Sequence, residues 1–513
     1  MRNKIIPLLT IIPLLSACQN SGPLSFVPFN KYVDEQHLSG KVNPLHTING
    51  DFASIKEFLY DNKDNRHHVV ANSLGEDKLL VLPIRFKDSD NTISLEDKTI
   101  YIQNAFFGDS SVTRHESVAS FYNKSSYGQL RITGEVAPWY ELDINASEWK
   151  KKGNEQTTAS RNITVAALKA LRNNPDFDLS IYDHNNDGYI DMVYTIYDYP
   201  YSDVSKNAIS EELFWAYTDF IKESENGVMP TEKYANAYAW SSLYFSNFQE
   251  NKKVDASTYI HETGHLLGLL DYYNTNQKDQ GYYYQPTGCF DVMDSNQGDH
   301  TVLSKYLLNW VSPKLLEKGK DVTVKLKDFS KTGEFLLLPL NEKYDNNPFN
   351  EYLLLEYFCP RDLNKGNGLS YQDIDINGNK VIFTFPNFHG LKVYHVDARL
   401  AYYTKKTNIG ALPKKICLVG EETTELSDAA VDFAFDNSIK SKDAETGSVL
   451  YHLLESSGEN TFKAGHLANN NTLFRYGDAF GIDTFKELSN RAGFTFKIVD
   501  VATNDVTIKF TSK

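Results

Sequence analysis

The spacing of hydrophobic positions divides the chain into two regions. In the first region, KLLVLPIRF is a nearly continuous apolar run and predicts a buried strand, and MVYTIYDYP and the aromatic NAYAWSSLYF also predict strands. LEDKTIYIQNAFF and ITVAALKALRNN have the spacing of helices, and LRITGEVAPWYEL predicts a strand with a turn at Thr133–Gly134. Strands that alternate with helices indicate an α/β or α+β layer structure.

Beyond about Pro313 the apolar runs become short and alternate with polar positions. DVTVKLKDF, GEFLLLPL, EYLLLEYF, KVIFTF, GLKVYHVD and DVTIKF predict strands that are separated by Gly, Asn and Asp turns. The second region is therefore expected to be β-rich and sandwich-like.

The first residues have the pattern of a secretion signal. Arg2 and Lys4 precede an apolar run that is too short for a comfortable transmembrane helix. Leu15-Ser16-Ala17-Cys18 resembles a bacterial lipobox, in which Cys18 becomes the lipid-modified first residue of the mature protein. The alternative is a plain cleaved signal peptide. The polar segment that follows has no sustained periodicity and predicts a linker or a prosegment.

Composition and charge narrow the class of protein. The chain has 513 residues, enough for two or three domains. Its net charge is -15, and the acidic residues are scattered along the chain instead of gathered in one tail. Nucleic-acid binding needs a basic face, so no nucleic-acid partner is expected. No later segment offers about 20 consecutive apolar residues, so the lipid at Cys18 is the expected membrane attachment. The remaining cysteines, Cys289, Cys359 and Cys417, are too sparse for a disulfide framework.

The segment STYIHETGHLLGLLDYYN combines an apolar helix with a polar set typical of zinc hydrolases. His261 and His265 are four residues apart and share one helix face, so both imidazoles can bind one metal ion. Glu262 lies beside them as a candidate base that moves the proton of an activated water. Gly268 allows the helix to end in a sharp turn, after which Asp271 can return as a third ligand. The alternative, a purely structural apolar helix, explains the leucines but not these polar residues.

The pattern H-E-x-x-H-x-x-G-x-x-D resembles the metzincin consensus of zinc endopeptidases, which also have a methionine turn under the zinc. Met293 in TGCFDVMDSNQGDH follows at a suitable distance, although an ordinary core methionine is the alternative. More specifically, the chain resembles the immune inhibitor A family of secreted bacterial metallopeptidases in several ordered blocks: LLVLPIRFKDS, SVASFYNKSSYGQLRITGEVAPWYEL, DLSIYDHNNDGYIDMVYTIYD, HETGHLLGLLDYYN, GCFDVMDSNQGDHTVLSKYLLNWVSP and GLKVYHVDARL.

The resemblance implies a metzincin-like zinc endopeptidase with His261, His265 and Asp271 as zinc ligands and Glu262 as the base. His300 is a rival third ligand, although Asp299 and His300 are more ordinarily a helix cap before TVLSKYLLNW. In the metzincin pattern the substrate pairs as an extra strand with an edge strand, and we assign NAYAWSSLYF to that edge. Its alternative is a buried strand without substrate contact.

Three residues are candidates for stabilising the oxyanion of the reaction. These residues are Tyr272, Tyr273 and His300, and the zinc ion can itself polarise the carbonyl.

A second constellation, DHNNDGYID, places oxygen ligands at alternate positions. The expected calcium ligands are Asp183, Asn185, Asp187, the Tyr189 carbonyl and Asp191, with Gly188 for the tight turn. Tyr194 stands where an EF-hand has its bidentate glutamate, so the loop is not a complete EF-hand. A shorter calcium loop and an Asx-rich turn without metal both remain open.

The sequence therefore predicts a lipoprotein signal peptide over residues 1–17 and a polar linker or prosegment over 18–76. A zinc metallopeptidase catalytic domain of α/β (α+β) class is expected over 77–315, and a β-rich domain over 316–513. The protein is expected to be exported and anchored at the cell surface by lipid, with release if the prosegment is cleaved, and to act on proteins or peptides. The alternatives are a non-catalytic adhesin or binding lipoprotein with a structural zinc site, and a zinc hydrolase of a cell-wall amide.

Overall fold

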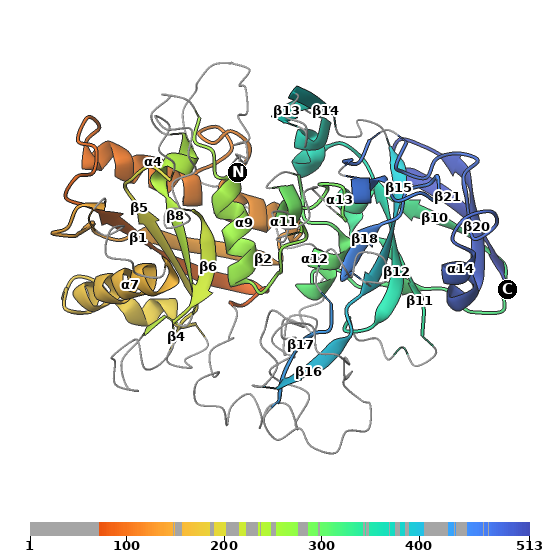
Figure 1. Cartoon of the computed structure of the whole chain (residues 1–513), viewed down its shortest axis with the longest axis horizontal. Helices are drawn as coiled ribbons and strands as arrows, with labels where there is room; N and C mark the ends of the chain where they lie inside the picture. Colours follow the sequence, from red (N-terminus) through yellow and green to blue (C-terminus); the bar gives the residue numbers. More distant parts are fainter. Residues whose placement is uncertain are drawn as a thin grey trace, which may run out of the picture. The chain divides into compact units, whose positions relative to one another are not determined.

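The computed structural model of the protein describes residues 71–146, 148, 156–184, 189–201, 215–221, 234–235, 237–247, 253–274, 286–295, 298–341, 344, 348–368, 370–374, 380–384, 389–404, 429–435, 437, 449–464, 466–469 and 471–513 (Figure 1). These residues form two compact units, 71–269 and 270–513. The predicted signal peptide with Cys18, nearly all of the 18–76 segment, and Cys417 lie outside the described residues, so those expectations remain predictions.

Unit 1 is built on a six-stranded sheet with the order β2-β1-β5-β8-β6, in which β3 also pairs with β1. Strands β2, β1, β5 and β8 are parallel, and β6 is antiparallel to β8. The strands are β1 (Gly75–Arg85), β2 (Leu130–Val136), β3 (Tyr140–Glu141), β5 (Met192–Tyr197), β6 (Tyr217–Phe220) and β8 (Ala237–Ser242), with a separate pair β4 (Tyr189–Ile190) and β7 (Tyr234–Ala235). The helices are α4 (Leu95–Phe107), α5 (Val118–Ser125), α7 (Gln156–Arg172) and α9 (Ser257–Leu266), with short 3-10 turns at Leu179–Tyr182 and Leu243–Ser246.

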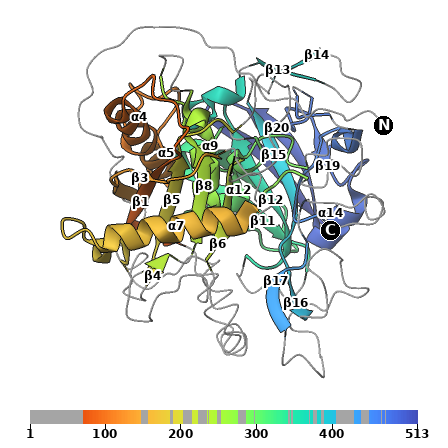
Figure 2. The same ribbon diagram turned by 60° about the vertical axis from the view of Figure 1, so that its left-hand side comes forward.

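Helices cover both faces of this sheet. On one face, alternate residues of β1, such as Leu80 and Leu82, pack with Ile163 and Leu168 of α7 in one apolar cluster. Figure 2 shows α7 on one side of the strands and α4, α5 and α9 on the other. A parallel sheet that is buried on both faces explains why its strands read as continuous apolar runs instead of alternating ones. The predicted α/β class is confirmed.

The sheet corrects two predictions about strands. NAYAWSSLYF is not the edge, because it forms β8, which pairs with β5 on one side and β6 on the other. All six residues of β8 are buried, which is typical of an internal strand. The predicted turn at Thr133–Gly134 is also wrong, because β2 continues through it. Gly134 has φ 150°, and a Cβ there would lie 2.0 Å from the Leu79 carbonyl oxygen, so the glycine serves close strand approach.

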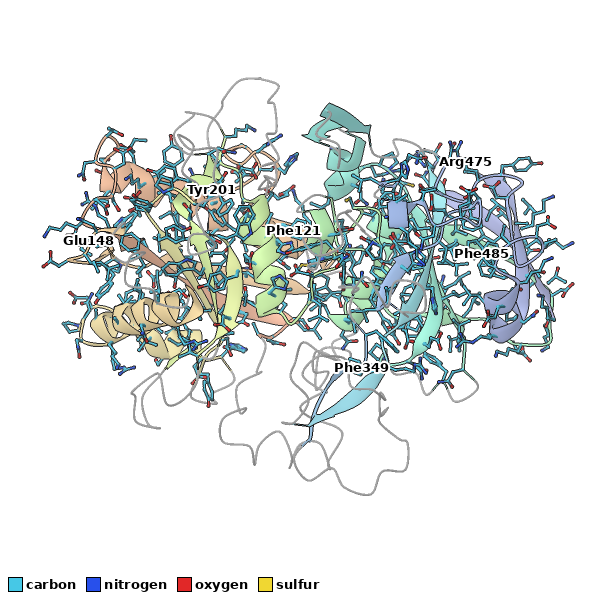
Figure 3. All side chains as sticks on the ribbon, viewed as in Figure 1. Phe121, Glu148, Tyr201, Phe349, Arg475 and Phe485 are labelled. Carbon is cyan, nitrogen blue, oxygen red and sulfur yellow. The ribbon has the colours of Figure 1, made fainter. Side chains whose placement is uncertain are left out.

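Unit 2 contains a five-stranded sheet, β18-β15-β12-β11-β9, and a four-stranded sheet, β10-β21-β20-β19. Side chains of both sheets share one apolar core, which includes Leu353 and Val393 of the first sheet and Phe496 and Ile508 of the second. Phe485, labelled in Figure 3, stacks on Phe480 in this core at 5.2 Å between ring centroids. The predicted β-rich, sandwich-like architecture is therefore confirmed.

The strands of the two large sheets are β9 (Lys314–Leu315), β10 (Val322–Lys327), β11 (Phe335–Pro339), β12 (Glu351–Phe358), β15 (Gly390–Asp397), β18 (Tyr451–Leu453), β19 (Ala479–Phe480), β20 (Phe494–Val501) and β21 (Asp505–Ser512). Two further antiparallel pairs are β13 (Ser370–Ile374) with β14 (Lys380–Thr384), and β16 (Leu400–Thr404) with β17 (Ala429–Phe433). The helices of unit 2 are α11 (Val292–Ser295), α12 (Val302–Leu307), α13 (Phe329–Thr332) and α14 (Lys486–Ala492), with 3-10 turns at Asp362–Gly368 and Thr461–Ala464.

Within the described part of the chain, every helix is too short or too polar to cross a lipid bilayer. Cys289 and Cys359 are both buried free thiols there.

Candidate metal centre

Helix α9 carries the two histidines and is held firmly at its start. The Asp255 carboxylate accepts hydrogen bonds from Ser257 N at 3.0 Å and Ser257 Oγ at 2.7 Å, which satisfies the first turn. The Tyr259 ring stacks on Phe106 at 5.2 Å, and its hydroxyl donates to the Ser242 carbonyl at the end of β8. These contacts fix the position of α9 against the sheet.

The end of α9 turns the chain back toward the histidines. Gly268 has φ 93°, and its N–H donates to the His265 carbonyl. Leu269 N then donates to the Gly264 carbonyl at 3.0 Å, so two carbonyls of the last turn are satisfied. The prediction that Gly268 ends the helix in a conformation suited to glycine is confirmed.

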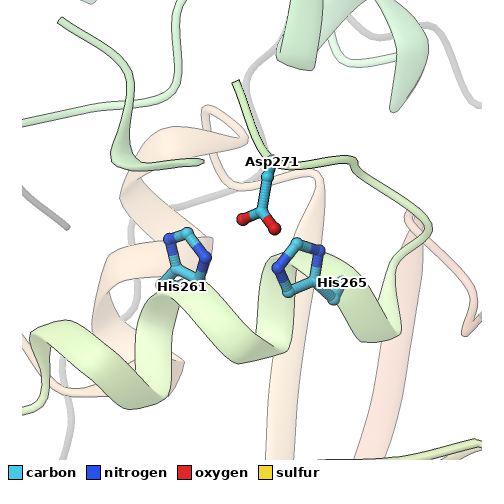
Figure 4. A group of neighbouring side chains, drawn as sticks. All are labelled: His261, His265 and Asp271. Atoms are coloured by element: carbon cyan, nitrogen blue, oxygen red, sulfur yellow. The ribbon is translucent and has the colours of Figure 1, made fainter. Parts of the chain in front are cut away.

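His261, His265 and Asp271 form a group in which one ligand atom from each lies within 4.8 Å of the others. Figure 4 shows the Asp271 carboxylate directed toward both imidazole rings. His265 Nδ1 donates to the Leu269 carbonyl at 2.7 Å, which leaves Nε2 with a lone pair for a cation. Two imidazole nitrogens and one carboxylate oxygen are a donor set that suits zinc and leaves a position for water.

Glu262 lies on the same helix between the two histidines and is 5% exposed. Thr218 of β6 lies 3.1 Å from the Glu262 carbonyl oxygen and 3.2 Å from its Oε2, so its hydroxyl can donate to either. Thr218 could not be predicted from the sequence, because β6 is short and the contact joins segments that are distant in the chain.

Met293 lies in α11 and is fully buried. Its carbonyl accepts the Tyr272 N–H at 3.0 Å, and its own N–H donates to Asp291 Oδ1 at 2.9 Å. A backbone hydrogen bond therefore connects the turn that contains Met293 to Tyr272, the residue directly after Asp271. Its role as the methionine turn under a metal remains a prediction.

Asp291 is a fully buried carboxylate whose contacts could not be predicted from the sequence. Its Oδ2 accepts hydrogen bonds from Thr301 N, Thr301 Oγ1 and Ser304 Oγ at 2.7, 2.6 and 2.9 Å. Burial alone would raise the pKa of Asp291, but hydrogen bonds from His300, Thr301 and the backbone lower it to about 2. A buried carboxylate with this many donors holds the Met293 turn and the start of α12 together.

The start of α12 corrects the predicted helix cap. The N-cap residue is Thr301, and the free amides of the first turn donate to carboxylates from elsewhere in unit 2. Thr301 N donates to Asp291 Oδ2, and Val302 N donates to Glu356 Oε2 at 2.9 Å. Asp299 instead accepts from the Lys305 ammonium at 2.6 Å. The prediction of Asp299 and His300 as the helix cap was wrong, because Asp291 and Glu356 from other parts of the chain accept the amide hydrogens at the start of α12.

The three oxyanion candidates differ in burial and in the residues around them. Tyr272 is fully buried, its ring lies 5.1 Å from that of Tyr451, and its hydroxyl oxygen lies 3.2 Å from Ser304 Oγ, so it belongs to the core of unit 2. His300 is also buried, with Nδ1 3.4 Å from Asp291 Oδ1. Tyr273 is half-buried and remains the candidate of the three whose side chain is not enclosed.

The predicted calcium loop is described only in part. Asp183 is buried, and Asp191 Oδ2 accepts the His184 N–H at 2.7 Å. Asn185 and Asp187, together with Gly188, lie outside the described residues. Asp77 of β1, which the sequence analysis missed, lies close enough to Asp191 that the two charges repel.

The α/β sheet has an antiparallel last strand, and the two-histidine helix ends in a glycine turn that returns a carboxylate toward the histidines. Residues 66–303 match the family model described as immune inhibitor A peptidase M6, catalytic domain. The predicted resemblance is confirmed, and the protein is a metallopeptidase, a hydrolase that acts on proteins or peptides. A search among curated proteins found no match.

Proposed function

We propose that the protein is a zinc-dependent endopeptidase in which Glu262 is the general base. The observation that carries this proposal is the group of His261, His265 and Asp271, with Glu262 on the same helix. The hydrogen bond from His265 Nδ1 to the Leu269 carbonyl supports it, because metal-binding histidines usually donate their other nitrogen in this way.

The chemistry follows from the residues at the site. A zinc ion bound by the three ligands would supply a more acidic water and polarise the scissile carbonyl. Glu262 accepts a proton from the water as its oxygen bonds to the carbonyl carbon, and returns that proton to the nitrogen as the C–N bond breaks. Tyr273 is the side chain we assign to the oxyanion, because it is half-buried and adjoins the core residue Tyr272.

We assign the substrate to β6 in place of β8. Among the described strands β6 ends the sheet, and its Thr218 contacts Glu262. An extended peptide that pairs with this edge through main-chain hydrogen bonds would pass beside the base.

The test compares casein cleavage by wild type, by wild type with a zinc chelator, and by Glu262→Ala at equal zinc content. We expect the chelator to abolish cleavage and Glu262→Ala to lower kcat at least about 100-fold, because a general base contributes that much or more. Glu317→Ala is the matched control, since Glu317 is exposed and pairs only with Lys320 among its described ion pairs.

Undiminished casein cleavage by Glu262→Ala would refute the assignment of Glu262 as the general base. Release of cell-wall fragments without casein cleavage would favour a cell-wall amide hydrolase. Zinc binding without activity on either substrate would favour an adhesin or binding lipoprotein with a structural zinc site.

We also propose that the protein is exported and anchored at the cell surface by a lipid on Cys18. The support is the basic start, the apolar run and the lipobox-like Leu15-Ser16-Ala17-Cys18. Labelled fatty acid should enter the wild type and not Cys18→Ser, and equal labelling of the two would refute the anchor. Active protein that lacks residues before 76 would identify the 18–76 segment as a cleaved prosegment.

Calcium binding by the loop at residues 183–191 is a further part of the proposal. Asp77 supports it, because this carboxylate is 1% exposed and its Oδ2 has no hydrogen-bond partner among the described residues. Burial, and then the charge of Asp191, hold the pKa of Asp77 well above its ordinary value, and a bound cation would remove that cost. Calcium should raise the melting temperature of wild type more than that of Asp77→Asn, and an equal rise would count against the site.

A further inference from the structure

Thr218 lies outside the zinc motif and contacts the proposed base directly. Its Oγ1 is 3.1 Å from the backbone carbonyl oxygen of Glu262 and 3.2 Å from Glu262 Oε2. One hydroxyl group therefore joins β6 to both the main chain and the carboxylate of the same residue of α9.

Thr218 is itself held in place by its neighbours. Its strand pairs with β8, where Thr218 lies opposite Ala239. The residues on either side are anchored, because the Tyr217 hydroxyl contacts Ser160 Oγ and Asp219 accepts from Arg161 Nη2 at 2.7 Å. A β-branched side chain also has few rotamers. The hydroxyl is thus a fixed point against which a flexible side chain can be oriented.

A glutamate that acts as a general base needs a fixed hydrogen-bond partner that orients its carboxylate. Its carboxylate is carried on several rotatable bonds, and proton transfer requires it at hydrogen-bond distance from the attacking water. A threonine hydroxyl has one hydrogen and two lone pairs. It can donate to Oε2 when Glu262 is a carboxylate. When Glu262 carries the proton, the hydroxyl can donate to the backbone carbonyl and accept from the carboxyl O–H. The Thr218 hydroxyl lies within hydrogen-bond distance of both Glu262 acceptors.

We propose that Thr218 is a positioning residue whose hydroxyl orients the Glu262 carboxylate for proton transfer, an inference that rests on the proposed function of Glu262. Thr218 acts through Glu262 and not on the substrate, so its loss should lower the rate of the bound complex and leave substrate binding nearly unchanged.

The test measures kcat, KM and zinc content for Thr218→Val, Thr218→Ser and Thr195→Val. Thr218→Val keeps the shape of the side chain and removes the hydroxyl. We expect its kcat to fall about 10- to 100-fold, the loss typical of a hydrogen bond to a charged group, at unchanged zinc content. KM should stay within about twofold of wild type. Thr218→Ser should recover most of kcat, because it restores the hydroxyl.

Thr195→Val is the matched control. Thr195 lies on β5 of the same sheet, and its hydroxyl pairs with Thr164 Oγ1 of α7 at 2.9 Å, on the face opposite α9. Its kcat should equal that of wild type even if its melting temperature falls.

Wild-type kcat in Thr218→Val would overturn the proposal. So would an equal loss in Thr195→Val, or a loss that Thr218→Ser does not repair, because either result would indicate a general effect on folding. Normal cleavage by Glu262→Ala would overturn the proposed function itself and is measured separately.

Discussion

Asp271 and His300 occupy different surroundings, although the sequence offers both as a third zinc ligand. Asp271 is half-buried and belongs to the group with His261 and His265. His300 is fully enclosed in unit 2, with its ring 5.8 Å from that of Trp310 and its Nδ1 3.4 Å from Asp291. An enclosed imidazole beside a carboxylate is a structural residue, so the geometry favours Asp271.

We predict that Asp271→Asn and His300→Gln separate zinc binding from folding. Asp271→Asn should lower zinc affinity by more than the roughly 10- to 100-fold that loss of a supporting residue costs, because it removes the anionic donor. His300→Gln should keep zinc affinity closer to wild type while its melting temperature falls, since it disturbs a buried contact. Competition with a coloured chelator measures the first quantity and thermal unfolding the second. If His300→Gln loses zinc and Asp271→Asn retains it, the assignment is reversed.

Among the elements, the turn after α9 is where local sequence and structure agree best. The histidine spacing, the glycine and the aspartate are all within one short segment, and helix and turn preferences act at that range. Gly268 adopts φ 93°, as its position in the motif predicts.

Gly268→Ala should therefore weaken both the fold and the metal site. A side chain at this positive φ costs about 1 kcal/mol of unfolding free energy, and relief of the strain would move the segment that carries Asp271. Urea unfolding measures the first effect and zinc titration the second.

Gly319→Ala provides the control for Gly268→Ala. Gly319 has φ 86°, and a Cβ there meets nothing within 4 Å. This variant should lose similar stability and keep zinc affinity. Equal zinc loss in both variants would mean that stability, not the position of Asp271, controls the metal site.

Elements whose roles depend on distant partners were predicted less well. The apolar runs correctly predicted β1, β5 and β8 as strands, and β1 as a buried one, but periodicity does not contain the order of strands in a sheet. NAYAWSSLYF was therefore assigned to the edge, which β6 occupies among the described strands. Thr218 and Asp291 were missed for the same reason, because their partners come from other parts of the chain.

At the scale of the whole molecule, each unit has its own apolar core, and the change from continuous to alternating runs predicted the change from α/β to β-rich. The polar groups that join elements within unit 2 could not be predicted, since they follow from packing. Glu351 at the start of β12 is an example. It accepts from His395 Nε2 of β15 at 2.9 Å and from Arg491 of α14. This carboxylate therefore links two neighbouring strands to a helix.

The charge on Glu351 makes the stability of unit 2 depend on pH. Burial alone would raise the pKa of Glu351, but hydrogen bonds and charge from His395 and Arg491 lower it from 4.5 to about 2. In the unfolded chain the carboxylate binds its proton near 4.5, so the folded state holds fewer protons between about pH 4.5 and 2. The stabilisation is complete above pH 4.5 and is lost as the pH falls through this window. Its size is about 3 kcal/mol of unfolding free energy.

We predict that Glu351→Gln removes most of this dependence. Between pH 6 and pH 2, the unfolding free energy from urea titration should fall by about 3 kcal/mol more in wild type than in Glu351→Gln, which has no charge to lose. Glu487→Gln, at an exposed position of α14, should follow wild type throughout. Parallel curves for wild type and Glu351→Gln would mean that the acid sensitivity comes from other carboxylates. A curve for Glu351→Gln that is flatter only below pH 4.5 would identify Glu351 as the group that links β12, β15 and α14 through its charge.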